Sequence, residues 1–240
     1  MKNTLYLLTF IGLNSSILGA VNFSTNFDAS EGYTNGKISN SSNFNESVAA
    51  GFYIPGGTAP DYGVVKRSPT SNGATAYYTT GAGADFSAGA SWTVSLDYTF
   101  EGVESSPTGS TAINHSLGFS GSSSSNSNLM FAGIQKGAAQ DGNYQLFING
   151  GGFSQKSFSF ADIGDDTTDA DDLTDSLRLE FSLTKSAVAN EFNAVATLYN
   201  IDSASTVATT STTLIRSGVY SADLFGYFKG SGGNENNNYD

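Results

Sequence analysis

The sequence contains no cysteine and few charged residues. Only 13% of its 240 residues are charged, and ten Lys and Arg stand against 22 Asp and Glu, so the formal net charge is −12. The absence of cysteine excludes disulfide scaffolds, thiolate zinc sites, iron–sulfur clusters and cysteine nucleophiles. Nucleic-acid binding needs clustered cations that displace counterions, so the charge balance argues against nucleic acid as a partner.

Long hydrophobic runs are also missing. The apolar stretch over residues 5–13 has nine residues, far short of the ~20 that cross a bilayer as a helix. Lys2 precedes this stretch and Gly19-Ala20 follows it, which is the order of a secretory signal. We therefore expect residues 1–20 to be a signal peptide cut after Ala20. This predicts a secreted, extracellular or cell-surface protein with no transmembrane span in the mature chain.

Alternatives to this leader stay open. Leu18 is larger than the A-x-A cleavage pattern prefers, so a shifted cut or a retained anchor is compatible with the sequence. A buried N-terminal helix is a further alternative.

The remaining residues form short apolar alternations separated by Gly, Ser, Asn and Asp. Every second residue is apolar over residues 92–100, which places Trp92 and Leu96 on one face of a strand. Residues 177–183 and 192–199 repeat this pattern and predict a hairpin. Weaker alternations predict strands over residues 22–27, 48–54, 74–79, 116–119, 129–135, 144–149, 153–160, 207–214 and 224–228.

These strands predict an all-β fold, a two-sheet antiparallel jelly-roll sandwich of about a dozen strands. No linker or fixed-period repeat divides the chain, so we expect one domain over residues 21–229. Residues 230–240 are rich in Gly and Asn and are expected to be a disordered tail.

Several segments resemble a known superfamily. They are Phe23-Ser-Thr-Asn-Phe27-Asp28, Glu31-Gly32-Tyr33, the strand Trp92-Thr-Val-Ser-Leu, and Leu177-Arg-Leu-Glu-Phe-Ser-Leu-Thr184 with Phe192-Asn-Ala-Val-Ala-Thr-Leu. They resemble the concanavalin A-like lectin/glucanase superfamily, in particular laminin-G-like modules of secreted bacterial surface proteins. The resemblance covers nearly all of residues 21–240, and it implies a jelly-roll fold and a role in contact with glycans.

The sequence departs from such proteins at its C-terminal end. The resemblance implies a Pro-Glu-Pro sorting motif, an apolar helix and a basic end, none of which is present. It also implies a last strand that pairs beside the first. We therefore expect a chain truncated before its closing strand, with the strand over residues 22–27 at an unpaired edge.

The sequence contains few residue patterns that are typical of an active site. Glycoside hydrolysis needs two carboxylates about 5 to 9 Å apart, and the superfamily's Glu-x-Asp-x-Glu string is absent. Glu180 shares its strand face with Arg178, which predicts a cross-strand ion pair, and Asp97 stands alone on its strand. The single histidine, His115, provides neither a catalytic relay nor a zinc site. No catalytic or cofactor-binding residue is predicted, and the sequence leans away from an enzyme.

An acidic segment precedes the strand at residue 177. It holds seven Asp in fourteen residues, from Asp162 to Asp175, and carboxylate oxygens on a loop are the ligands that Ca²⁺ prefers. The expected ligands are Asp165, Asp166, Asp169, Asp171 and Asp172. A solvated acidic loop that protects a sheet edge explains the same residues without a metal.

Carbohydrate recognition by β-sandwiches relies on exposed aromatic rings beside amide and carboxylate groups. Adjacent strand residues point to opposite sides, so either Tyr77 or Tyr78 is expected to face outward, and Tyr53 and Tyr62 lie near turns. These four tyrosines are the candidate contacts for a glycan or polysaccharide, whereas Trp92 is expected in the core.

The sequence thus predicts a secreted, non-catalytic module that binds glycan or other extracellular matter. A structural or adhesive surface protein without a ligand pocket is the alternative. A carbohydrate-active hydrolase or lyase is a lesser one.

Overall fold

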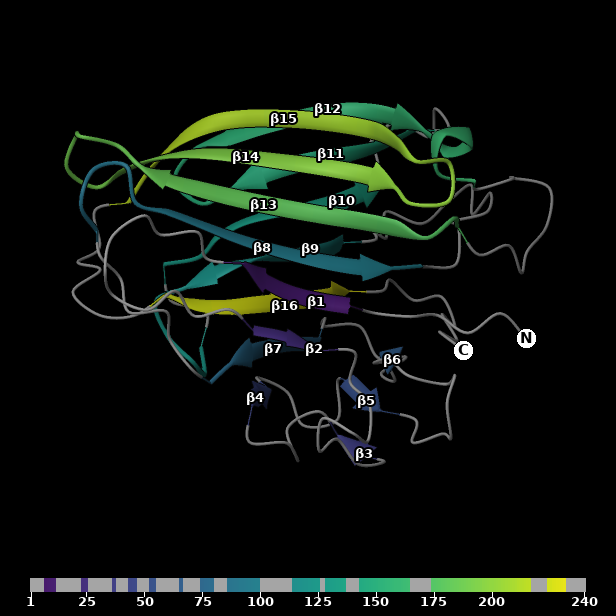
Figure 1. Cartoon of the computed structure of the whole chain (residues 1–240), viewed down its shortest axis with the longest axis horizontal. Coiled ribbons are helices and arrows are strands. Elements are labelled where there is room, and N and C mark those ends of the chain that lie inside the picture. The colour runs from purple at the N-terminus through teal and green to yellow at the C-terminus, as the bar shows by residue number, and fades with distance from the viewer. Residues whose placement is uncertain are drawn as a thin grey trace.

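A computed structural model describes residues 7–11, 23–25, 36–37, 43–46, 52–54, 65–66, 74–79, 86–99, 114–125, 128–136, 143–164, 174–216 and 224–231. Within these ranges the chain is almost entirely β-strand, and every strand pair is antiparallel. Two large sheets face each other as a sandwich, with a small third sheet beside them (Figure 1). The predicted all-β antiparallel sandwich is confirmed.

The six-stranded sheet has the order β15-β14-β13-β8-β1-β2. Its strands are β1 (Leu7–Ile11), β2 (Phe23–Thr25), β8 (Ser91–Tyr98), β13 (Leu177–Lys185), β14 (Glu191–Asn200) and β15 (Ser205–Ile215).

The seven-stranded sheet has the order β12-β11-β10-β9-β16-β7-β4. Its strands are β4 (Phe44–Glu46), β7 (Ala74–Tyr78), β9 (Asn114–Ser120), β10 (Met130–Lys136), β11 (Asn143–Asn149), β12 (Phe153–Ser159) and β16 (Phe225–Ser231). The third sheet holds β3 (Gly36–Lys37), β5 (Phe52–Ile54) and β6 (Val65–Lys66).

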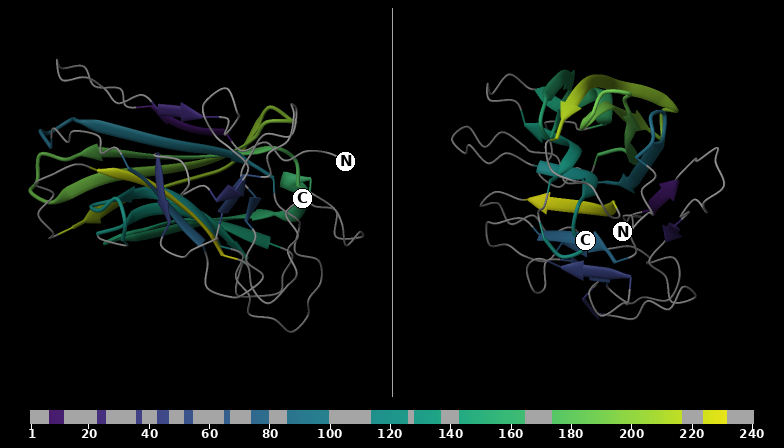
Figure 2. Two further views of the ribbon diagram at one scale, coloured as in Figure 1. Left: turned by 90° about the horizontal axis from the view of Figure 1, so that it is seen from below. Right: turned by 90° about the vertical axis from the view of Figure 1, so that its left-hand side faces the viewer.

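The chain changes sheet between its two longest meanders. Strands β9 to β12 follow one another in the seven-stranded sheet, and the 3-10 helix η3 (Phe160–Ile163) then leads toward the meander β13 to β15 in the other sheet. Strand β16 returns to the seven-stranded sheet and pairs between β9 and β7. The edge-on view separates the two layers (Figure 2).

The predicted alternation explains the core between these layers. Along β13 and β14 buried and more exposed residues alternate, and the two strands form the predicted hairpin. Trp92 is buried, as expected, and its ring centroid lies 5.6 Å from that of Phe86 and 6.4 Å from that of Phe192. Leu96 is half-buried and packs against the same core.

One side of the sandwich is closed by contacts between β12 and β15. The Ser154 and Thr210 hydroxyls lie 2.6 Å apart, and the Ile215 N–H donates to the Gly151 carbonyl at 3.2 Å. A Cβ at Gly151 would lie 2.1 Å from the Ile215 carbonyl oxygen, and the φ of Gly151 is 101°. Glycine is therefore required for the β11–β12 hairpin to approach the end of β15.

The opposite side ends in short strands. Strand β2 is the outermost strand of its sheet and has β1 as its one strand neighbour in the described part of the chain. Among the described strands, β2 is therefore an edge strand, the position expected for the strand over residues 22–27.

Part of the predicted signal peptide forms strand β1. This strand lies between β8 and β2, and the alternative of a helix is wrong for Leu7–Ile11. Removal of the leader stays a prediction, as do the domain limits and the disordered tail. Across the described ranges no helix is long and apolar enough to span a bilayer.

Candidate functional site

The outer face of the seven-stranded sheet carries an aromatic cluster that is separate from the sandwich core. The Phe131 ring lies edge-on to Phe147, with centroids 5.8 Å apart, and edge-on to Tyr227 at 6.1 Å. Tyr227 in turn stacks on Tyr77 at 6.2 Å. Phe147, Tyr227 and Tyr77 are buried but do not belong to the core cluster.

Two glycines make room for this cluster. Gly118 pairs with both Phe131 and Tyr227, and Gly133 pairs with Phe147. A Cβ at Gly118 would lie 2.8 Å from the Phe131 Cβ, and one at Gly133 would lie 2.9 Å from the Phe147 ring. The aromatic rings therefore lie over bare backbone, which is a common reason for glycine inside a strand.

The exposed end of this face lies over β10, β11 and β12. Phe153 is 56% exposed, Asn149 and Gln155 are exposed, and Phe131, Gln135 and Gln145 are half-buried. We call these six residues the amide–aromatic patch.

Strand register sets the geometry of the patch. Asn149 pairs with Phe131 on one side and with Phe153 on the other. Neighbouring strands lie about 4.8 Å apart, so the Cα atoms of the two phenylalanines are separated by roughly 10 Å. The Asn149 Oδ1 accepts from the Gly150 N–H at 2.6 Å, and the Gln135 Nε2 donates to the Gln145 Oε1 at 3.1 Å. The patch thus presents two rings with amide groups between and beside them.

None of the six patch residues is charged. Among the side chains that the structure describes on this outer face, none is a carboxylate. The patch therefore offers stacking and neutral hydrogen bonding, and the described part of the face does not present the carboxylate pair that glycoside hydrolysis uses.

The expectation that Tyr77 or Tyr78 is exposed is wrong. The two side chains do point to opposite faces of β7, because Tyr78 packs on Phe44 of the core whereas Tyr77 stacks on Tyr227. Both faces are covered at this position, and the exposed fractions are 0% for Tyr77 and 7% for Tyr78. Alternation predicts the direction of a side chain but not whether something covers it.

The other two candidate tyrosines cannot be assessed in the same way. Tyr53 lies in β5, but its side chain is outside the described residues, as is all of Tyr62. Their role in glycan contact stays a prediction.

The buried tyrosines have altered acidity. Burial raises the pKa of Tyr227 far above its ordinary value. Burial also raises the pKa of Tyr77. Both hydroxyls therefore stay protonated at neutral pH, so they act as hydrogen-bonding groups rather than as bases.

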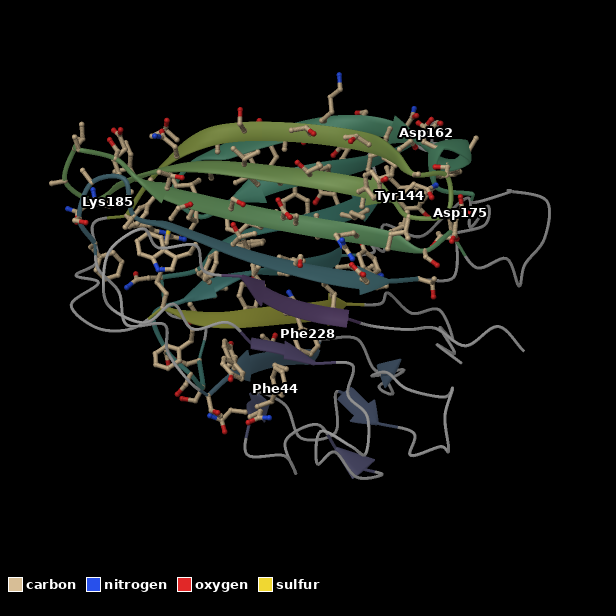
Figure 3. All side chains as sticks on the ribbon, in the orientation of Figure 1. Phe44, Tyr144, Asp162, Asp175, Lys185 and Phe228 are labelled. Carbon is tan, nitrogen blue, oxygen red and sulfur yellow. The ribbon has the colours of Figure 1, made fainter. Side chains whose placement is uncertain are left out.

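The predicted calcium ligands Asp165, Asp166, Asp169, Asp171 and Asp172 lie outside the described residues. Both ends of their loop are described, at one end of the sandwich where Asp162 and Asp175 lie close together (Figure 3). No group of three or more His, Cys, Asp or Glu side chains that could hold a metal occurs in the described residues. The calcium site stays a prediction.

The two ends of the acidic loop are joined by hydrogen bonds. The Asp175 N–H donates to the Ile163 carbonyl at 2.8 Å. The buried Asn200 donates from Nδ2 to the Asp175 Oδ2 at 2.7 Å and to the Asp162 carbonyl at 3.2 Å. Gly164 has a φ of 70°, and a Cβ there would lie 2.6 Å from the Asp175 carboxylate. These hydrogen bonds therefore hold the first and last residues of the acidic loop close together.

The ion pair expected for Glu180 is formed by Asp97 instead. Strand register places Arg178 opposite Asp97, whereas Glu180 lies opposite Ser95 and Thr197. The Arg178 Nε and Nη2 donate to the two Asp97 oxygens, both at 2.6 Å. Because both oxygens are engaged, Asp97 serves a structural ion pair rather than acid–base chemistry. His115 is half-buried and its ring packs against Tyr98.

The patch phenylalanines were not among the predicted glycan contacts. Both lie in predicted strands, and Phe153 follows three glycines, a turn signal that places it at a strand end where exposure is common. That signal could have identified Phe153, but no local signal distinguishes the half-buried Phe131 from a core residue.

Comparison with known proteins gives few matches. No protein-family model matches this chain, and the curated proteins contain no match either. Among solved structures the chain is similar to arcelin-5, a lectin-like defense protein from Phaseolus vulgaris. The sequence identity is 9%, the TM-score is 0.38, and the likeness covers 85% of this chain and 89% of that chain.

Proposed function

We propose that this protein is an exported, non-catalytic β-sandwich module that binds neutral glycan chains through the amide–aromatic patch. The proposal extends to a location outside the cell or at the bacterial surface, and to a likeness with laminin-G-like modules. The leader-like residues 1–20 support export, and the patch supports glycan binding.

The single observation that carries the glycan proposal is the row Phe153, Asn149, Phe131. Sugar rings have apolar C–H faces that stack on aromatic rings and a hydroxyl rim that hydrogen-bonds to amides. Phe153 offers an exposed ring, and Asn149 lies between it and the half-buried Phe131. The row crosses three strands, so a bound chain would lie across the strands rather than along them.

Charge favours a neutral ligand. The patch carries no charge, and the whole chain has a formal net charge of −12. This field repels polyanions such as uronic-acid polymers at low ionic strength. Neutral polysaccharides avoid that cost.

Replacement of Phe153 by alanine tests the proposal. Loss of the stacking ring is expected to weaken binding by about 1–2 kcal/mol, roughly tenfold in Kd. Stability should change little, because the ring is mostly in solvent. Ligands are first identified on a glycan array, and affinity is then measured by affinity electrophoresis in gels that contain the neutral polysaccharide.

Val195→Ala is the matched control. Val195 is also an apolar side chain, 42% exposed, but it lies on β14 in the six-stranded sheet, whereas the patch lies on the seven-stranded sheet. Its replacement should leave the affinity unchanged. Equal losses in both variants, or binding that survives in Phe153→Ala, would refute the patch as the binding site. Failure to bind any glycan would favour a structural or adhesive surface protein, and release of reducing ends from a bound polysaccharide would favour a hydrolase.

A further inference from the structure

Strand β1 connects two features of this chain that are otherwise unrelated. Its residues belong to the segment expected to be removed on export, yet it occupies an inner position of the six-stranded sheet. It pairs with β8 over five residue pairs, from Leu7↔Asp97 to Ile11↔Thr93, and with β2 over three. In Figure 1 it follows directly below β8. Removal of the leader therefore converts β8 from an inner strand into an edge strand.

The edge that remains is unusual for an exposed one. On its core side, Val94 is fully buried and Leu96 packs against the core. On its outer side, Ser95 and Asp97 are buried while β1 is in place, and the charge of Asp97 is paired with Arg178. Natural edge strands are short or are blocked by charge, proline or bulges. Strand β8 has eight residues, and β13 pairs with it in continuous register on its other side.

We propose that the β8 edge is a docking site for an extended, apolar polypeptide strand. In the full-length chain β1 occupies it, and after leader removal a strand from another polypeptide takes its place, antiparallel to β8. The proposal rests on export, as proposed above, but not on glycan binding, because β8 and the amide–aromatic patch belong to different sheets.

The chemistry of the occupant follows from what β1 supplies. An added strand must pair with the backbone of residues 93–97, whose N–H and C=O groups are costly to leave unsatisfied. Its residues opposite Val94 and Leu96 must also be apolar, because those two positions lie on the core side of β8. Strand addition to a sheet edge combines such backbone pairing with alternate side-chain contacts.

The full chain with strand β1 disabled tests the proposal. The double substitution Thr9→Pro and Phe10→Pro removes two adjacent amide donors. Because alternate residues of an inner strand bond to opposite neighbours, this weakens pairing on both sides of β1. A synthetic peptide of residues 5–13, flanked by lysines for solubility, is the probe. The same peptide with both prolines is its control.

Hydrogen exchange along β8 is the main readout. In the variant, the β8 amides that pair with β1 should lose protection, while β13–β14 amides stay protected and report an intact fold. Added peptide should restore protection in β8 and change the fluorescence of Trp92, the single tryptophan, which lies on this strand. The proline peptide should do neither.

Several results would overturn the proposal. They are unchanged β8 exchange in the variant, equal effects of both peptides, and protection of β8 without peptide because β2 pairs with it directly. If the double variant does not fold, the peptide should restore β13–β14 protection when it is added during refolding. Failure of the peptide to do so would also overturn the proposal. Glycan affinity measured on the same samples should not respond to the peptide, so the two proposals fail separately.

Discussion

At the scale of residues, strand register decides which of two carboxylates, Asp97 or Glu180, pairs with Arg178. Asp97 is 13% exposed in its side chain and Arg178 is 44% exposed. The Asp97 hydrogen bond is the main cause that raises the pKa of Arg178. Glu180, two residues further along β13, adds a favourable field, whereas the Arg178 Nε and Nη2 hydrogen bonds go to Asp97. The bidentate contact therefore belongs to Asp97.

Replacement of Asp97 by asparagine should lower the free energy of unfolding. The expected loss is about 1–2 kcal/mol, because the guanidinium loses a charged, two-point acceptor but remains partly hydrated. Urea unfolding at neutral pH measures it. Glu180→Gln is the control and should stay within about 0.5 kcal/mol of the parent chain. A larger effect of Glu180→Gln would show that the face is stabilised by its general field rather than by the direct pair.

At the scale of elements, the glycines of β9 and β10 link the fold to the patch. Gly118 lies under the Phe131–Tyr227 contact and has no room for a side chain, since a Cβ would lie 2.2 Å from the Met130 carbonyl oxygen. Strand pairing and ring packing on the outer face therefore depend on the same residue.

Gly118→Ala should destabilise the protein and displace the Phe131 ring. Forcing a methyl group against backbone atoms costs about 1–3 kcal/mol, and glycan affinity should fall with it. Gly89→Ala is the matched control, because Gly89 has a φ of +90° but open space around its Cβ position. It should cost about 1 kcal/mol of backbone strain and leave glycan affinity unchanged. Equal glycan affinities in Gly118→Ala and Gly89→Ala would show that Gly118 does not position the patch.

The sequence predicted most elements but missed β1, which it assigned to the leader, and three very short strands. Residues in each of the twelve predicted ranges form strands, whereas β3, β4 and β6 have only two or three residues. Period-two alternation needs at least four residues to be recognised. These short strands are selected by a neighbouring strand rather than by their own pattern.

At the scale of the whole molecule, the sandwich buries tyrosines on both faces of the seven-stranded sheet. Tyr144 packs in the core against Phe158 and Phe160, whereas Tyr227 packs on the outer face. Because Tyr227 is buried, we expect the stability of the fold to depend on pH in the alkaline range.

Stability should fall as the pH rises above about 10. The pKa of Tyr227 is raised in the folded state above the ordinary tyrosine value of about 10, so the unfolded chain releases its proton first. The stabilisation is complete below that pH and is lost above it. Urea unfolding between pH 8 and about 11.5, with phenolate absorbance, measures this.

Tyr227→Phe should weaken the pH dependence over this range. If all 12 tyrosines of the folded protein titrate together near their ordinary value, burial of Tyr227 does not contribute.

Local pattern alone determined the longer strands of the two meanders, their inward faces and the position of Trp92 in the core. It did so because alternation is a property of neighbouring residues. The tertiary structure decided the rest. Register paired Arg178 with Asp97 rather than leaving it for Glu180, and packing buried both Tyr77 and Tyr78. The sheet also took up Leu7–Ile11 as strand β1. Each of these depends on which distant segment lies alongside, and strand register and coverage are set by non-local contacts that no single stretch of sequence contains.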